Sequence, residues 1–271
     1  MLLKSIFMIR AGGFGEDFGI KLIMSLIGLG ICIYDWRIND RNDYFWVFIT
    51  GTLIWSLIEL ILQFGGTRII QEKNLFGLDV TNALWLTISL QGMSEGAFVA
   101  VIGMIFGDRL LNEEIRKKWS VIYLLALMTL LPLYIPRGIN FTDVNIGDLS
   151  IPSRRDMFPL SAIIFIVFMC VIAIIWLITT TPRARKRGIY MYFVMASFIA
   201  WWNLLEWLTG QRFIEIGTLN SDGTYTNLSR APPFIEFLAI AYDALIEVSL
   251  IYVPFLAIPY WLNLIEKEEE I

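Results

Sequence analysis

Long apolar segments alternate with short polar ones along this 271-residue chain. Each apolar segment has about the length, roughly 20 residues, that an α-helix needs to cross the hydrocarbon core of a bilayer. The pattern predicts seven spans, at 18–36, 44–63, 81–107, 119–136, 157–180, 188–209 and 234–263. We expect an all-α fold, a polytopic membrane helix bundle that forms a single membrane domain over residues 1–271. Pro254 and Pro259 predict a kink in the second half of the last span.

Composition agrees with a membrane protein and excludes several kinds of chemistry. Hydrophobic residues make up 57% of the chain, against about 45–50% in soluble domains. The chain has no histidine, which excludes imidazole as a metal ligand or catalytic base. Cys32 and Cys170 lie in apolar runs, which favours buried thiols over a disulfide. Which cofactor the protein uses, if any, is not indicated by the sequence. Residues 1–10 are too short for a signal peptide and predict an amphipathic flank on the membrane surface.

The basic residues predict an orientation, because the connections between spans alternate between two faces. Those on one face are residues 37–43, 108–118 and 181–187. Those on the other are residues 64–80, 137–155 and 210–233. The first set holds ten Lys and Arg residues in 25 positions, and the second holds seven in 60. Short basic loops remain in the cytoplasm, so we expect the N-terminus outside and the C-terminus inside, in the cell membrane.

Other features of the connections fit this orientation. Glycosylation sequons at Asn140 and Asn227 both fall on the predicted outer face. Residues 210–233, rich in Gly, Ser, Thr and Asn, read as an irregular outer loop. Membrane topology accounts for the basic loops, so we expect no nucleic-acid partner.

Two halves of the chain resemble each other. An offset of 147 places Trp55 on Trp202 and Glu59 on Glu206, and an offset of 152 places Glu95 on Glu247. We expect a pseudo-symmetric 3+1+3 arrangement. Its parts are a first repeat at 18–107, a linker helix at 119–136 and a second repeat at 157–263. Both triplets then run in the same direction, as a parallel repeat. This architecture resembles that of the SWEET sugar transporters, although their proline-glutamine signature is absent and no residue carries over.

Five acids lie within the predicted spans: Glu59, Glu95, Glu206, Asp243 and Glu247. Each costs about 2.5–3.5 kcal/mol at mid-bilayer. No Lys or Arg lies deep inside a span, so we expect protonation, water, a bound cation or a position at a helix end to offset this cost. Crowding predicts that at least one of Glu95, Asp243 and Glu247 holds a proton near neutral pH.

Spacing places these acids in a common cavity. Gln91 and Glu95 are four residues apart, as are Asp243 and Glu247, so each pair shares one helix face. We expect a cavity that opens outward and is closed inward by residues 253–259. The residues expected to supply hydroxyl donors are Ser94, Tyr242 and Ser249.

Three functions fit the pattern. The first is a transporter or binding protein for a cation or small amphipathic, lipid-like solute within the lipid bilayer. Its site residues are Glu59, Gln91, Glu95, Glu206, Asp243, Glu247, Trp55 and Trp202. The second is a membrane enzyme acting on a lipid or isoprenoid, with a Glu as general acid. Residues 232–237 resemble the proline-glutamate motif of the small lycopene cyclases, but lack its second acid. The third is a structural subunit, in a homo-oligomer or a larger membrane complex.

Overall fold

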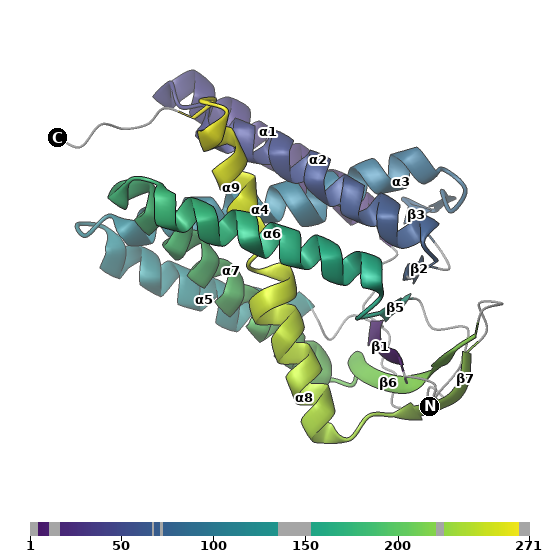
Figure 1. Cartoon of the computed structure of the whole chain (residues 1–271). Coiled ribbons are helices and arrows are strands. Elements are labelled where there is room, and N and C mark those ends of the chain that lie inside the picture. The colour runs from purple at the N-terminus through teal and green to yellow at the C-terminus, as the bar shows by residue number, and fades with distance from the viewer. Residues whose placement is uncertain are drawn as a thin grey trace.

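The computed structural model describes residues 5–10, 17–66, 68–70, 73–134, 153–220 and 225–265. This part of the chain is mostly helical, and helical segments lie at all seven predicted positions (Figure 1). The helices are α1 Phe18–Asn39, α2 Asp43–Phe64, α3 Leu84–Gln91, α4 Val99–Leu111, α5 Arg116–Tyr134, α6 Leu160–Thr179, α7 Pro182–Leu208, α8 Pro233–Tyr242 and α9 Tyr252–Trp261. Two π-helical segments, η2 Gly92–Phe98 and η5 Asp243–Val248, follow α3 and α8.

Five of the described helices are long and apolar enough to cross a membrane: α1, α2, the continuous helix α3–η2–α4, α6 and α7. Their outward surfaces carry large exposed apolar side chains, such as Leu26, Leu53, Ile164 and Phe193. A soluble protein rarely exposes apolar surface on this scale. The molecule therefore has the character of a multi-pass membrane protein.

The last helical segment breaks in its middle, where the prolines predict a kink. After η5 the chain passes through a turn at residues 249–251 before α9 begins at Tyr252. Pro254 has no N–H to donate to the carbonyl of Leu250, and its ring would clash with that carbonyl in a regular helix. The break therefore lies just before Pro254, while α9 itself includes Pro259.

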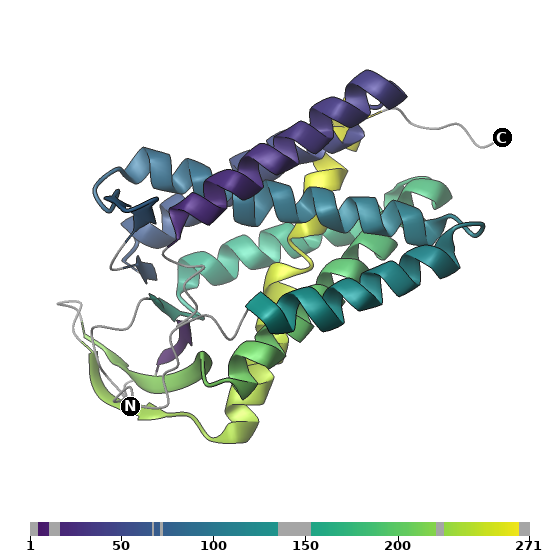
Figure 2. The ribbon, with the colours of Figure 1, turned by 180° about the vertical axis from the view of Figure 1, so that it is seen from behind.

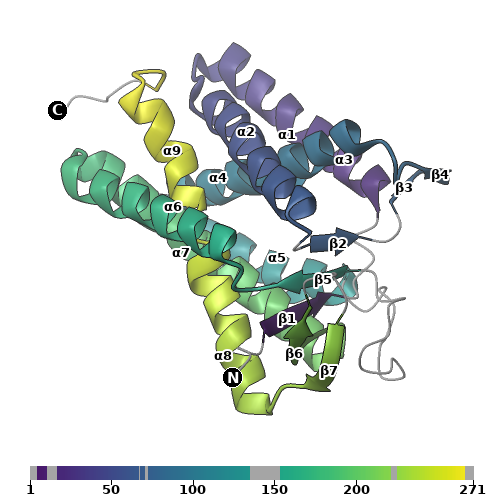
Figure 3. The same ribbon diagram turned by 45° about the vertical axis from the view of Figure 1, so that its right-hand side comes forward.

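The all-α expectation is wrong at one end of the bundle, where five strands form a sheet in the order β2-β5-β1-β6-β7 (Figures 1 and 3). These strands are β1 Ser5–Arg10, β2 Arg68–Ile70, β5 Ser153–Asp156, β6 Arg212–Leu219 and β7 Tyr225–Arg230. A separate small hairpin joins β3 Asn74–Leu75 to β4 Leu78–Asp79.

Two expectations about the chain outside the helices are corrected by this sheet. Residues 5–10 are a strand inside the sheet rather than a flank on the membrane surface, because β1 bonds to β5 on one side and to β6 on the other. The predicted irregular loop at 210–233 contains the β6–β7 hairpin. The sequon at Asn140 and the acidic residues 266–270 lie outside the described residues. Asn227 lies in β7 and is exposed.

Helix α2 and segment η2 approach each other closely, because glycines remove side chains from their contact. A Cβ at Gly96 would lie 2.7 Å from the carbonyl oxygen of Gly51 and would also clash with Trp55. A Cβ at Gly92 would lie 2.6 Å from the carbonyl oxygen of Thr52. Small residues four apart allow this kind of contact between membrane helices. The contact fixes Glu95, which lies between the two glycines, beside α2.

Replacing Gly96 by alanine should therefore lower the thermal unfolding temperature of the purified protein in detergent, because overpacking costs about 1–3 kcal/mol. Gly30→Ala in α1 is the matched control, since a Cβ there would meet nothing within 4 Å. It should leave the unfolding temperature unchanged or raise it. Equal effects of the two substitutions would contradict the close approach.

Candidate functional site

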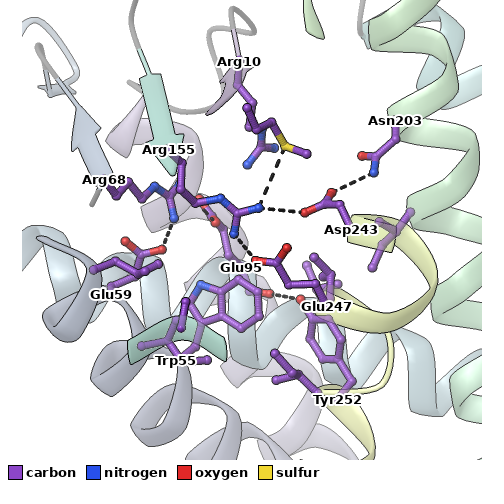
Figure 4. A pocket seen from close by; sticks show the side chains of 18 of the residues that line it. Arg10, Trp55, Glu59, Arg68, Glu95, Arg155, Asn203, Asp243, Glu247 and Tyr252 are labelled. Atoms are coloured by element: carbon purple, nitrogen blue, oxygen red, sulfur yellow. Dashed lines mark hydrogen bonds and ion pairs between the residues drawn. The ribbon is translucent and has the colours of Figure 1, made fainter. Parts of the chain in front are cut away.

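A cavity of about 470 Å³ lies between the α1–α2 pair and the α6–α7 pair, at the end of the bundle where the sheet lies. One part of its wall is apolar and includes Met24, Ile58, Phe165, Ile199 and Ile251. The opposite part is formed by charged side chains from four strands and three helical elements (Figure 4). The cavity is thus amphipathic.

Four arginines reach the cavity from the sheet: Arg10 of β1, Arg68 of β2, Arg155 of β5 and Arg212 of β6. Arg68 is the cross-strand partner of Arg155, and Arg10 is the partner of Arg212. Directly opposed residues point to the same face of a sheet, and like charges in that position repel. The sheet therefore presents two repelling arginine pairs to the helices, which requires carboxylates nearby.

In the first half of the chain, Arg68 and Lys21 supply the countercharges. Arg68 forms an ion pair with Glu59, which is fully buried in α2. Lys21, also fully buried, lies one turn into α1 with its Nζ 3.0 Å from Glu95 Oε1. Nη2 of Arg68 is 3.9 Å from the other oxygen of Glu95.

In the second half, Arg155 and Arg212 take the same role. Arg155 Nη2 lies 3.0 Å from Asp243 Oδ1, and its Nη1 binds Glu247 (Figure 4). Arg212 lies 3.0 Å from the other oxygen of Asp243 and 2.7 Å from Glu206 Oε2. Asn203 completes the shell of Asp243 with a 2.8 Å hydrogen bond from its side-chain amide.

These ion pairs offset the charge of the acids without a bound cation. Glu59 and Glu206 fit the helix-end alternative, because Arg68 and Arg212 follow soon after the helices that carry these acids. Most of the compensating charge comes from strands outside the spans. Burial acts to lower the pKa of Arg155, but Glu247 and Asp243 outweigh it and raise that pKa. Burial lowers the pKa of Arg212, against Glu206 and Asp243, and Arg10 lowers it further. That one of the acids is protonated stays a prediction.

Six of the eight predicted site residues line the cavity: Trp55, Glu59, Glu95, Trp202, Asp243 and Glu247. Gln91 does not, because its side-chain oxygen accepts a hydrogen bond of 3.1 Å from Gln63. Glu206 lies behind Arg212. Asp243 and Glu247 both line the cavity, as their spacing predicts, whereas of Gln91 and Glu95 only Glu95 does.

Other expected features of the cavity differ in the structure. The hydroxyls of Ser94 and Ser249 donate to carbonyls of their own helices, at Leu90 and Ala244, and do not serve the cavity. Tyr242 is also absent from its lining. The lining instead includes Tyr252, whose ring stacks on Trp55 at 5.6 Å. Beyond Tyr252, residues 253–257 are buried and fill the bundle below the cavity.

Three polar groups in the lining have no hydrogen-bond partner among the described residues. They are the indole N–H of Trp55, Oε2 of Glu247 and the guanidinium of Arg10. Trp55 and Glu247 are both more than nine-tenths buried. An unpaired buried polar group costs about 1–3 kcal/mol, so the lining offers two donors and one acceptor to a guest.

The motif at residues 232–237 has a structural role. Glu236 accepts hydrogen bonds from Trp207 Nε1 at 2.9 Å and from Arg230 Nε at 2.7 Å. The backbone N–H of Ile214 also donates to it, at 3.3 Å. Glu236 therefore ties α7, α8 and the β6–β7 hairpin together, and it does not line the cavity.

Sequence reasoning missed Arg10, Lys21 and Arg155, and it did not include Arg68 and Arg212 among the site residues. A signal existed for Arg68 and Arg212, since each follows a helix that carries a buried acid. Arg155 and Arg10 have no such local signal, because their partners are distant in sequence. Among the described residues, no group of three acidic or thiol side chains is placed to hold a metal ion.

Comparison of the chain with protein-family models, curated proteins and solved structures finds no match.

Replacing Arg68 by glutamine should lower the free energy of unfolding by about 3–5 kcal/mol, because it leaves a buried carboxylate without its partner. Arg37→Gln is the matched control. Arg37 is exposed in the last turn of α1 and makes no ion pair with a carboxylate in the described chain, so its replacement should cost about 1 kcal/mol or less. Unfolding in detergent, followed by circular dichroism, compares the two. Similar small losses would contradict the buried network.

Proposed function

We propose that this protein binds an amphipathic, lipid-like molecule with an anionic headgroup in the cavity beneath the sheet. The apolar part of the wall would hold the hydrocarbon portion, as in most small-molecule sites. The headgroup would lie against Arg10, and the indole N–H of Trp55 is a further donor in the lining. The observation that carries the proposal is the guanidinium of Arg10, which faces the cavity without a hydrogen bond or ion pair to any described residue.

The charges around the cavity favour an anion over a cation. The carboxylates are Glu59, Glu95, Glu206, Asp243 and Glu247. The cations are Arg10, Lys21, Arg68, Lys73, Arg155 and Arg212. Lys73 is included because it interacts electrostatically with Glu59, Lys21 and Arg68. Its ammonium group donates hydrogen bonds to Gln63 and Thr87 and makes no ion pair with a carboxylate in the described chain. Six cations face five carboxylates, so one positive charge remains.

An anion would therefore neutralise the site, whereas a metal or organic cation would add to its positive charge. A surplus charge in a low-dielectric site is costly. Each acid that lines the cavity also already has an arginine or lysine partner. The sequence left open a cation or a small amphipathic solute as the ligand. Because the acids are already paired, we favour the amphipathic solute.

Binding of cis-parinaric acid, a fluorescent fatty acid, and of its uncharged methyl ester tests the proposal on the detergent-solubilised protein. The wild-type chain should bind the acid about tenfold more tightly than the ester, because a hydrogen bond to a charged group contributes about 1.5–3 kcal/mol. Arg10→Gln should remove this preference. The matched control Arg37→Gln, at the exposed end of α1, should keep it.

A second pair of variants tests the apolar part of the cavity in the same assay. Ala162→Phe extends a ring into the cavity from α6 and should weaken the acid and the ester alike. Val167→Phe, on an exposed position of the same helix, should weaken neither. If the ester binds as tightly as the acid to the wild-type chain, or if Ala162→Phe has no effect, the proposal fails.

We also propose that the sheet lies outside the cell and the opposite end of the bundle lies in the cytoplasm. The predicted outer connections contain few free cations, which supports this orientation. Arg68, Lys73, Arg154 and Arg212 are all buried, and Arg230 pairs with Glu236. Cations held in this way are not available to anionic headgroups, so the basic bias toward the other face is larger than the sequence count suggests.

Labelling of single cysteines with a membrane-impermeant maleimide on intact cells tests the orientation. A cysteine introduced at Thr226 in β7 should be labelled, and one at Asn112, between α4 and α5, should be labelled only after lysis, since both positions are exposed. The reverse pattern would place the sheet in the cytoplasm.

We further propose that the halves are repeats. Each consists of a strand, two helices, a second strand and a helix with a π-helical segment that carries an acid. The two halves exchange strands, since β1 pairs with β6 of the second half and β5 pairs with β2 of the first. β1 and β5, the first strands of the two halves, pair antiparallel with each other, so a two-fold axis through this pair would relate one half to the other. Homologous chains whose halves have diverged less should show alignable halves, and their absence would count against the repeat.

A further inference from the structure

A second pocket, of about 600 Å³, lies at the opposite end of the bundle from the sheet. It is formed where three connections meet: α1–α2, α4–α5 and α6–α7. Figures 1 and 2 show the last two connections next to each other at the end far from the strands. A basic bias of the loops explains why cations lie on this face, but it does not explain a pocket of this size.

Cations dominate the lining of this pocket. They are Arg41, Arg109, Arg183, Lys186 and Arg187. Only Asp108 in the lining, and Asp43 just behind it, carry negative charge. Five cations therefore face two carboxylates.

Both carboxylates are already used to hold Arg187. Asp108 receives two hydrogen bonds from Arg187, at 2.7 and 2.8 Å, and a third from the hydroxyl of Tyr44 at 3.0 Å. Asp43 lies 2.6 Å from Arg187 Nη1, and the hydroxyl of Tyr260 accepts from the same nitrogen at 3.3 Å. Arg187 is buried by these contacts and forms a rigid floor.

The exposed cations around this floor have few countercharges. Lys186 and Arg109 make no ion pair with any residue in the described ranges, and the guanidinium of Arg109 lies 5.4 Å from the ring of Trp119. Arg41 is at the rim, with 42% of its side chain exposed, and pairs with Asp43 at 3.1 Å and with Asp108 at 3.6 Å. Arg109 and Lys186 therefore carry the uncompensated positive charge of the pocket, from α4 and from α7.

The start of α7 adds to this positive potential. Thr181 caps this 27-residue helix, accepting a 3.3 Å hydrogen bond from the N–H of Ala184, and both residues line the pocket. The N-terminus of a helix favours negative charge. Together, the basic lining and the helix terminus match a compact group with several negative oxygens.

We propose that this pocket binds a phosphate-bearing anion, separate from the cavity beneath the sheet. Phosphate oxygens suit arginine because its guanidinium can donate two parallel hydrogen bonds. The group can belong to the headgroup of a lipid in the adjacent leaflet, since basic pockets between membrane helices bind such headgroups, or to a soluble phosphate compound.

Thermal unfolding of the full chain in detergent, at constant ionic strength, tests this site with three probes. They are inorganic phosphate, dioctanoyl phosphatidic acid and the uncharged dioctanoylglycerol. The variant is the double substitution Arg109→Gln, Lys186→Gln. Its matched control is Lys117→Gln, Lys118→Gln, which removes two exposed cations on the same face outside the pocket.

The chain with the pocket unchanged and the control chain should be stabilised by a phosphate-bearing probe and not by dioctanoylglycerol. The Arg109→Gln, Lys186→Gln chain should need roughly thirtyfold more of that probe for the same shift, because each of the two lost cations contributes about 1 kcal/mol. Stabilisation by phosphatidic acid alone identifies a lipid headgroup, and stabilisation by inorganic phosphate as well identifies a soluble compound.

All chains in this experiment also carry Ala162→Phe, which fills part of the cavity beneath the sheet, so that this cavity does not contribute to the response to either dioctanoyl lipid. The outcome is therefore independent of the function proposed for that cavity. If neither phosphate probe stabilises the control chain, or if both double variants respond equally, the site does not exist.

Discussion

The pairing of buried carboxylates with arginines is the interaction on which the arrangement of this molecule depends. Carboxylates inside membrane helices are costly, and arginines that face each other across a sheet repel. Neither set is stable alone, and each compensates the other where the sheet meets the helices. Arg155 shows this most clearly, because one guanidinium binds both Asp243 and Glu247. The ion pairs therefore determine where the strands lie on the bundle, and their positions leave a cavity lined by charge on one side only.

The helices place the acids for this pairing through two local irregularities. Glu95 and Glu247 both lie in π-helical segments, which are rare and are frequently found at functional sites. The glycines at 92 and 96 let the first of these segments approach α2 closely. Backbone irregularity and close packing thus hold each acid in one orientation, so the arginines meet a fixed target.

Sequence patterns predict the helices well and the sheet poorly, for a physical reason. A span has to satisfy the bilayer along about 20 residues, which leaves a strong apolar signal. The central strand β1 has six residues, of which the middle four are apolar, so it resembles the start of another membrane segment. Its role depends on β5 and β6, whose pairing is not encoded locally. The acids could be recognised from the sequence as candidate site residues, because charged residues are rare in a span. Arg155 could not, because it lies in a polar connection where arginine is common.

The exchange of strands between the halves has a consequence for biosynthesis. Chains emerge from the ribosome N-terminus first, yet Met8 in β1 meets Arg155 across a separation of 147 residues. The first strand leaves the ribosome long before its neighbours exist, and it must wait until the helices between them have entered the membrane. Its closure is then a late event that follows correct insertion of both halves. If one helix inserted in the wrong direction, β1 and its partner strands would lie on opposite sides of the bilayer. β1 would then remain an unpaired apolar segment that cellular quality control could detect.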